Sequence, residues 1–231
     1  WTTIQMSSKT FPSLSFESEL FDSGAEFVLG IDEVGRGAIA GPVAVGVSVI
    51  SRAAQTSAWP AELRDSKLLS EAARERLFEP VGEWVAGWSI GMASAAEIDS
   101  NGIVWALATS AARALNQLAG TFAPAKTIAI LDGSHNWLGA MPFEVRVRTK
   151  ADRDCASVAA ASVLAKVTRD RLMVGLDAEH PRYGFAGHKG YASAGHMDAV
   201  REFGPSVQHR LTWLGRILAK DDADSAVIGE S

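Results

Sequence analysis

The segment Leu29–Gly37 constrains this chain more than any other, because an apolar run ends there in two adjacent carboxylates, Asp32 and Glu33. A glycine, an arginine and a second glycine follow within four residues. The apolar residues indicate a buried strand, where an unpaired carboxylate is costly. A positive charge must compensate the two acids, and a divalent metal ion is the natural candidate. We therefore expect a metal site at the end of this strand.

The composition favours a globular protein with a substantial core. The chain has 231 residues, of which 47% are hydrophobic and 21% are charged, enough for one large domain. No apolar stretch approaches the roughly 20 residues of a membrane span, and no basic segment leads into an apolar one at the start. The single cysteine, Cys155, excludes an internal disulfide and an all-cysteine metal site. We expect a cytoplasmic, monomeric protein without membrane contact.

The net charge of −5 argues against a nucleic-acid partner until its distribution is considered. Residues 1–27 and 220–231 each carry a net charge of −3, which leaves the body of the chain at +1. Within that body, residues 145–171 are net +4. This block predicts a local basic surface, on which we place Arg169 among other cations.

Residue periodicity and turn signals predict an α/β fold with a mixed five-stranded sheet flanked by helices and a small helical C-terminal segment. Trp84, Trp88 and Trp105 are expected in the core. The expected strands cover 27–32, 43–51, 84–92, 126–131 and 143–148. The expected helices cover 70–79, ended by Pro80, then 94–119 with a break at Asn101-Gly102, 154–179, 193–203 and 208–220.

The same signals divide the chain into four parts. Residues 1–26 form an extension that is either loosely held or packed through its aromatic side chains. The main domain covers 27–180, and a helical C-terminal segment covers 181–220. Residues 221–231 form an acidic tail.

Further carboxylates occur near the ends of other predicted elements. Asp132 follows a second strand, and Asp152 and Asp154 precede the long helix. Acids brought together at converging strand ends would repel one another unless cations held them ionised. Oxygen ligands select Mg²⁺ or Mn²⁺, and two such ions about 4 Å apart can assist in-line attack on phosphorus. Taken singly, Asp132 also suits a turn and Asp154 a helix cap, and spacing does not decide between Asp152 and Asp154.

The glycines of Gly35-Arg36-Gly37 also have two interpretations. Alone, the pattern is a tight turn with a solvated arginine. Beside two acids, the glycines would let the backbone approach a sugar or phosphate, which amide groups and Arg36 could bind.

Ordered motifs across residues 27–210 resemble ribonuclease HII, the bacterial type 2 ribonuclease H family. The motifs are Gly30-Ile31-Asp32-Glu33-Val34-Gly35-Arg36-Gly37, Asp65-Ser66-Lys67, Leu131-Asp132-Gly133, Lys150-Ala151-Asp152, the run 160–170 (AASVLAKVTRD), and Tyr183-Gly184-Phe185 leading to His188-Lys189-Gly190-Tyr191.

The resemblance implies a ribonuclease H-like fold and an endonuclease that cuts RNA in RNA–DNA hybrids. It also implies cleavage on the 5′ side of single ribonucleotides embedded in duplex DNA, by metal-assisted attack of water, leaving 3′-hydroxyl and 5′-phosphate ends. Hybrids and ribonucleotide-containing duplexes are then its partners, Mg²⁺ or Mn²⁺ its cofactor, and ribonucleotide excision repair its setting.

The same resemblance implies that the C-terminal segment 181–220 contributes to substrate binding, and it implies a role for each matching residue. The family's metal-binding acids correspond to Asp32, Glu33, Asp132 and Asp152, where the motif selects Asp152 over Asp154. The family residues that read the sugar at an RNA–DNA junction correspond to Gly35, Arg36, Gly37 and Tyr191. Those near substrate phosphates correspond to Ser66, Lys67, Ser162 and Lys166.

Some positions depart from the family pattern. The usual second lysine after Asp-Ser is replaced by Leu68, which removes one possible phosphate contact. Two rival functions stay open: a nuclease of the same architecture that acts on DNA junctions, and a non-catalytic hybrid-binding protein. Cys155 is expected to be a small packed residue, and the histidines show no metal-ligand spacing.

Overall fold

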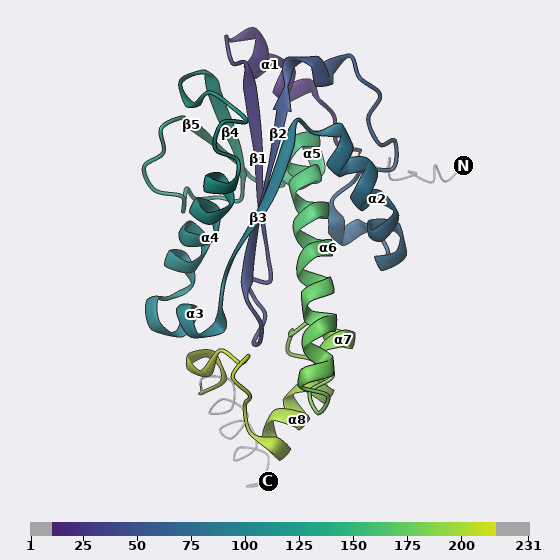
Figure 1. The fold of residues 1–231 in the computed structure, drawn as a ribbon, viewed down its shortest axis with the longest axis vertical. Coiled ribbons are helices and arrows are strands. Elements are labelled where there is room, and N and C mark those ends of the chain that lie inside the picture. Colours follow the sequence, from purple (N-terminus) through teal and green to yellow (C-terminus); the bar gives the residue numbers. More distant parts are fainter. Residues whose placement is uncertain (1–10, 216–231) are drawn as a thin grey trace, which may run out of the picture.

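The computed structural model describes residues 11–215, and its core is one five-stranded sheet between two layers of helices (Figure 1). The strands are β1 (Phe27–Val34), β2 (Val43–Ser51), β3 (Gly87–Ala93), β4 (Thr127–Asp132) and β5 (Glu144–Arg148). The α-helices are α1 (Ser15–Asp22), α2 (Glu71–Trp84), α3 (Ala95–Asn101), α4 (Ile103–Gln117), α5 (Ala151–Asp154), α6 (Ala156–Glu179), α7 (Phe185–His188) and α8 (Ala194–Phe203), with short 3-10 turns at η1 (Arg52–Gln55), η2 (Ser66–Leu68) and η3 (Pro124–Lys126).

The sheet has the order β3-β2-β1-β4-β5. Strands β3, β2 and β1 are antiparallel neighbours, whereas β1, β4 and β5 run parallel. The mixed α/β fold expected from the sequence is therefore confirmed. Because β1 and β4 are parallel and in register from Phe27 and Thr127 to Ile31 and Leu131, both strands deliver their next residue to the same edge.

Helices cover both faces of the sheet, and small residues let them approach it closely. On one face, α6 lies so near β1 that a Cβ on Gly30 would come within 2.2 Å of the Ser157 carbonyl carbon. On the other face, a Cβ on Gly91 would meet the carbonyl oxygen of Ser110 in α4 at 1.9 Å. Side chains alternate between the two faces, so Val28 packs on the α6 side and Leu29 on the α4 side.

Two helix boundaries differ from the sequence-based expectation. Helix α2 continues through Pro80 to Trp84 instead of ending at Glu79, because Leu77 and Val81 are buried against the core. Burial of that face offsets the lost backbone hydrogen bond and the clash, which together cost about 3 kcal/mol. The long helix begins at Ala156, since Cys155 is extended and separates α5 from α6. The predicted break at Asn101-Gly102 is present, with φ of +83° at Gly102.

The N-terminal extension packs on the core through helix α1 and is not loosely held there. Phe21 is fully buried, and the Glu17 carboxylate accepts hydrogen bonds from the Ser157 amide (2.8 Å) and hydroxyl (2.7 Å) at the start of α6. Residues 1–10 lie outside the described part of the chain.

Two predictions of exposure were wrong. Trp105 is 41% exposed, because it is not on the buried side of α4, which runs from Ala106 to Ala114. Trp84 and Trp88 pack partly buried on the core. Arg169, which we placed on a basic surface, is fully buried. The predicted last helix is helical over 211–215, and its remainder and the acidic tail lie outside the described residues. Within 11–215 no helix is both long and apolar enough to cross a bilayer.

Candidate active site

The site is built where β1 and β4 end. Ile31 and Leu131 are in register, so Asp32 and Asp132 emerge side by side. Gly30 contacts α6, and Ile130 belongs to the hydrophobic cluster around that helix. Residues two apart on a strand point to the same face of the sheet, so both carboxylates lie on the α6 face. Asp32 is 4% exposed, and its Oδ1 accepts the Glu33 amide hydrogen at 2.9 Å.

Asp152 reaches the same place from α5. The Asp132 Oδ1 atom accepts the amide hydrogen of Ala151 at 2.7 Å, which fixes α5 against the end of β4. Lys67 Nζ donates to Asp152 Oδ2 at 2.8 Å. Asp154, the alternative that spacing left open, points instead to Arg148 at 3.6 Å and is partly exposed. The geometry thus separates two acids that lie two residues apart.

The acids perturb one another strongly. Burial raises the pKa of Asp32 well above its ordinary value, and the neighbouring Glu33 charge raises it further. Burial likewise raises the pKa of Asp132, with a second contribution from Asp152. Burial alone would lower the pKa of Lys67, but its hydrogen bond to Asp152 and the charges around it outweigh that effect and raise it. Lys67 therefore keeps its positive charge at neutral pH beside these carboxylates.

The donor atoms suit a hard divalent cation. Asp32, Glu33, Asp132 and Asp152 offer oxygen atoms alone, which is the preference of Mg²⁺ and Mn²⁺. Their mutual repulsion is a further reason to expect a cation. As the side chains stand in residues 11–215, no three acidic, histidine or cysteine groups are gathered closely enough to hold an ion. Lys67 supplies the charge compensation instead.

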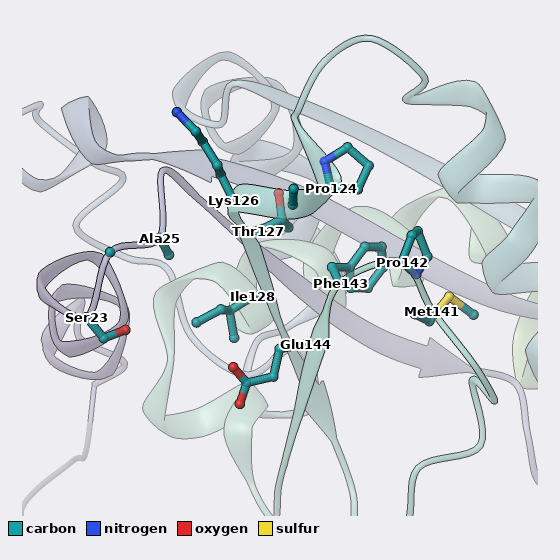
Figure 2. A pocket seen from close by; sticks show the side chains of 12 residues that line it. Ser23, Ala25, Pro124, Lys126, Thr127, Ile128, Met141, Pro142, Phe143 and Glu144 are labelled. Atoms are coloured by element: carbon teal, nitrogen blue, oxygen red, sulfur yellow. The ribbon is translucent and has the colours of Figure 1, made fainter.

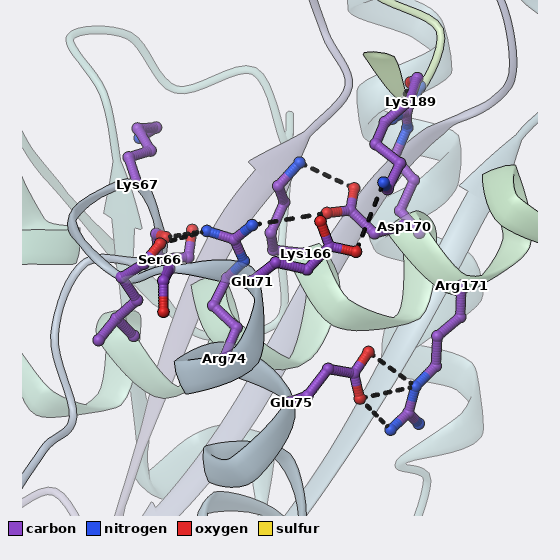
Figure 3. A network of polar contacts seen from close by, with 12 residues as sticks. Ser66, Lys67, Glu71, Arg74, Glu75, Lys166, Asp170, Arg171 and Lys189 are labelled. Carbon is purple, nitrogen blue, oxygen red and sulfur yellow. Dashed lines mark hydrogen bonds and ion pairs between the residues drawn. The ribbon is translucent and has the colours of Figure 1, made fainter. Parts of the chain in front are cut away.

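A hydrogen-bonded network fixes the phosphate-binding candidates (Figure 3). The Ser66 and Ser162 hydroxyls lie 2.8 Å apart, which ties η2 to α6. Lys166 Nζ donates to Asp170 Oδ1 at 2.8 Å. Arg74 in α2 donates to the Ser66 carbonyl oxygen at 2.9 Å and lies 3.9 Å from Asp170. These contacts hold Ser66, Ser162 and Lys166 on one wall of the site.

Tyr191 forms another wall and is 37% exposed. Lys166 Nζ and Arg169 Cζ lie 5.7 and 5.6 Å from its ring centroid. Its carbonyl oxygen accepts a hydrogen bond from His196 Nδ1 at 2.8 Å, and His196 Nε2 lies 3.0 Å from His209 Nε2. Both imidazoles are buried, and burial lowers the pKa of each to about 4. Neutral, buried rings therefore support the backbone of Tyr191.

The tautomers of these rings follow from their partners. A carbonyl oxygen only accepts, so His196 carries its hydrogen on Nδ1 and leaves Nε2 bare. His209 Nδ1 accepts the Ser206 amide hydrogen at 2.9 Å, so His209 donates from Nε2 to His196. A proton added to either bare nitrogen would break one of these bonds.

These walls enclose a cavity of about 430 Å³. Every site residue predicted from the sequence lines it except Asp152, which Lys67 joins to it. Its lining is Asp32, Glu33, Val34, Gly35, Arg36, Gly37, Ser66, Lys67, Asp132, Ser162, Lys166 and Tyr191.

A larger hollow of about 590 Å³ lies at the opposite ends of β1 and β4 (Figure 2). Its charged side chains are Lys126 and Glu144, and each is paired on the surface, with Glu26 and Arg146 respectively. It contains one carboxylate, whereas three line the smaller cavity, so the smaller cavity is the candidate active site.

Comparison with known proteins identifies the family of this chain. The ribonuclease HII family model matches residues 29–215. The chain belongs to the ribonuclease HII family. It is therefore a ribonuclease H, an endonuclease that hydrolyses the RNA strand of RNA–DNA hybrids. The ribonuclease HII of Streptomyces coelicolor is 44% identical over 191 residues, which cover 83% of this chain and 78% of the relative. That of Syntrophotalea carbinolica is 41% identical over 212 residues, 89% and 96% of the two chains.

Solved structures share the fold. The ribonuclease H2 of Pyrococcus horikoshii is 26% identical with a TM-score of 0.64, covering 81% of this chain and 93% of its own. A Bst ribonuclease HIII, solved in complex with Mn²⁺, is 21% identical with a TM-score of 0.65, covering 84% and 68%. The ribonuclease H-like architecture expected from the motifs is confirmed.

Sequence reasoning missed several residues that shape this candidate site. Asp65 is 6% exposed, and its Oδ1 accepts the Lys67 amide hydrogen at 2.9 Å while lying 4.0 Å from Lys67 Nζ. Its place in the Asp-Ser-Lys motif was the available signal. Asp170 lies one helical turn from Lys166, a spacing that could have revealed the pair. For Arg74, which contacts both the Ser66 carbonyl oxygen and Asp170, the sequence offered no signal.

Proposed function

We propose that this enzyme cuts on the 5′ side of ribonucleotides, including single ribonucleotides in duplex DNA, and leaves 3′-hydroxyl and 5′-phosphate ends. The observation that carries this proposal is one cavity in which Asp32, Glu33 and Asp132 lie beside Gly35–Gly37 and Tyr191. Carboxylates with the oxygen atoms that Mg²⁺ and Mn²⁺ prefer and groups suited to bind a sugar thus line the same cavity.

Asp32, Glu33, Asp132 and Asp152 would hold Mg²⁺ or Mn²⁺, in keeping with the Mn²⁺ bound by the ribonuclease HIII neighbour. When bound, such ions supply a water of lowered pKa and stabilise charge on the leaving oxygen. The protein's own contribution is to hold its carboxylates at fixed strand and helix ends. Lys67 on Asp152 keeps a cation at this place and can donate a hydrogen bond to a substrate phosphate oxygen.

The choice of metal-assisted attack over a protein base rests on the lining of the cavity. Within the described residues, neither a histidine nor a cysteine lines it. Burial raises the pKa of Cys155 to about 12, which makes it inert as a nucleophile. The carboxylates and a bound water therefore carry the hydrolysis.

Selectivity for RNA rests on the 2′-hydroxyl, the group that separates the two sugars. Arg36, Gly37 and Tyr191 are exposed and all line the cavity. The proposed role of Tyr191 is to pack on the deoxyribose that follows the ribonucleotide, where a 2′-hydroxyl would crowd the ring. Ser66, Ser162 and Lys166 would bind phosphates.

The test is cleavage of three duplexes in Mg²⁺: all-DNA, RNA–DNA hybrid, and DNA with one ribonucleotide. We expect cleavage of the last two alone, loss of activity with a chelator, and loss of at least about 100-fold in Asp132→Asn. Cleavage of all-DNA duplex would favour the rival junction nuclease. Hybrid binding without cleavage would favour the non-catalytic protein. Tyr191→Ala should lose cleavage at the single ribonucleotide more than on the hybrid, and equal losses would remove its sensor role.

A further inference from the structure

Two fully buried arginines lie beneath the loop that connects β1 to β2. Arg169 of α6 and Arg210 of the C-terminal segment are both 0% exposed. Within residues 11–215, neither guanidinium has a carboxylate oxygen within 4.0 Å. A buried cation without an anionic partner is unusual, because loss of hydration must be offset by other contacts.

The contacts of Arg210 are backbone carbonyl oxygens of this loop. It donates to Gly35 O at 2.7 Å, to Arg36 O at 2.9 Å, and to Gly41 O at 3.1 and 3.2 Å. Burial lowers the pKa of Arg210 to about 9, so the guanidinium is still protonated at neutral pH. Arg169 acts on the far end of the same loop, through Ala40 O (3.2 Å) and Pro42 O (2.8 Å).

The direction of these carbonyl groups fixes the direction of the amide groups. The described peptide bonds are all trans, so each N–H points opposite to the carbonyl of the preceding residue. Gly35 O and Arg36 O point inward to Arg210, and the N–H groups of Arg36 and Gly37 therefore point outward. Both residues are exposed and line the cavity. Neither amide donates to another described residue.

We propose that Arg210 is a positioning residue for ribonucleotide recognition, which turns the Arg36 and Gly37 amides toward the sugar–phosphate oxygens of the substrate. The inference rests on the proposed function of this cavity. A planar guanidinium reaches three carbonyl oxygens at once, which a lysine ammonium on a flexible stem does not reproduce. The backbone of the C-terminal segment reinforces this arrangement, since Arg210 N donates to Ile39 O at 2.9 Å and Gly41 N to Gln208 O at 2.7 Å.

The test compares the wild type with Arg210→Lys and Arg210→Gln. Arg171→Gln is the matched control, because Arg171 lies on α6 and pairs with Glu75 on the surface. The readout is the ratio of kcat/KM between a duplex with one ribonucleotide and the same duplex with a 2′-fluoro nucleotide there. This ratio does not depend on the fraction of enzyme that is folded, so partial unfolding of a variant does not move it.

We expect the Arg210→Lys and Arg210→Gln ratios to fall at least 5-fold toward unity, with the control unchanged. A ratio equal to that of the wild type, whatever the loss of stability, would overturn the positioning role. A wild type that fails to cleave the one-ribonucleotide duplex would instead refute the proposed function.

A second measurement uses the wild type alone, in a chelator so that the substrate stays intact. Hydrogen exchange at the Arg36 and Gly37 amides is expected to be fast in the free enzyme and at least 10-fold slower with the one-ribonucleotide duplex than with all-DNA duplex. Equal exchange with both duplexes would overturn the proposal even if the Arg210 variants do not fold.

Discussion

Gly30→Ala tests how closely α6 and β1 must approach to form the site. The new Cβ would lie 2.2 Å from the carbonyl carbon and 2.3 Å from the carbonyl oxygen of Ser157, and 2.5 Å from the amide nitrogen of Val158. All three are backbone atoms, so no side chain can rotate away. To restore an ordinary contact of about 3.4 Å, α6 must move by about 1.2 Å from β1. Asp32 follows Gly30 on β1 by two residues, and Ser162 lies on α6, so the same shift widens the cavity.

Overpacking of a core costs about 1–3 kcal/mol, and a backbone collision belongs at the upper end of that range. For a chain of this length, about 3 kcal/mol lowers Tm by about 6–12 °C. Thermal unfolding followed by circular dichroism measures this shift. Cleavage of an RNA–DNA hybrid in Mg²⁺, at a temperature where the variant is folded, measures the effect on the site, and we expect at least a 10-fold loss of kcat.

Gly175→Ala is the matched control on the same helix. An added Cβ at Gly175 meets no atom within 4 Å, so alanine should stabilise the helix by about 0.5–1 kcal/mol and leave activity unchanged. A Gly30→Ala enzyme with a Tm within about 2 °C of the wild type and full activity would refute the reasoning.

Two further predictions concern charge. Burial lowers the pKa of His196 and His209 from about 6.5 to about 4, so below pH 6.5 the unfolded chain takes up protons that the folded chain does not. The free energy of unfolding should therefore fall between pH 6.5 and 4, by about 2 kcal/mol for each ring at pH 5. Urea unfolding at pH 7 and pH 5 should show a smaller loss of this free energy for His209→Gln than for the wild type. An equal loss in the two proteins would contradict this origin. Lys67→Met should lower kcat/KM about 10–100-fold, because it removes the cation on Asp152, whereas Lys126→Met in the distant hollow should leave it unchanged; equal activity of both variants would exclude the role of Lys67.

The sheet was predictable because its strands carry strong local signals. The apolar runs at β1, β2 and β4 and the alternation at β5 fixed four strands within one or two residues. Strand β3 begins three residues after its predicted start, because burial of Leu77 and Val81 extends α2 through Pro80 to Trp84. The helix-breaking propensity of Pro80 alone did not reveal that burial of the neighbouring apolar side chains outweighs it. The helix α1 was missed because its packing against α6 depends on contacts far apart in the chain.

The candidate site was predictable where motifs state the chemistry, as at Asp32-Glu33 and Gly35-Arg36-Gly37. Spacing could not separate Asp152 from Asp154, because that choice depends on how α5 docks on Asp132. The buried arginines were misjudged or missed for a related reason. Most arginines lie on the surface, so a sequence-based prediction places an arginine there. Arg169 and Arg210 are buried by carbonyl partners that include residues 127 and 175 positions away, and such distant contacts leave no local sequence signal.

The central claim is that the carboxylates gathered around the ends of β1 and β4 carry the hydrolysis. Cleavage of a duplex with one ribonucleotide in Mg²⁺ by Asp152→Asn and by Asp154→Asn tests it most directly, since the two acids are two residues apart and the structure gives them different partners, Lys67 and Arg148. We predict a loss of at least about 100-fold for Asp152→Asn and less than about 3-fold for Asp154→Asn. A fully active Asp152→Asn enzyme would contradict the account.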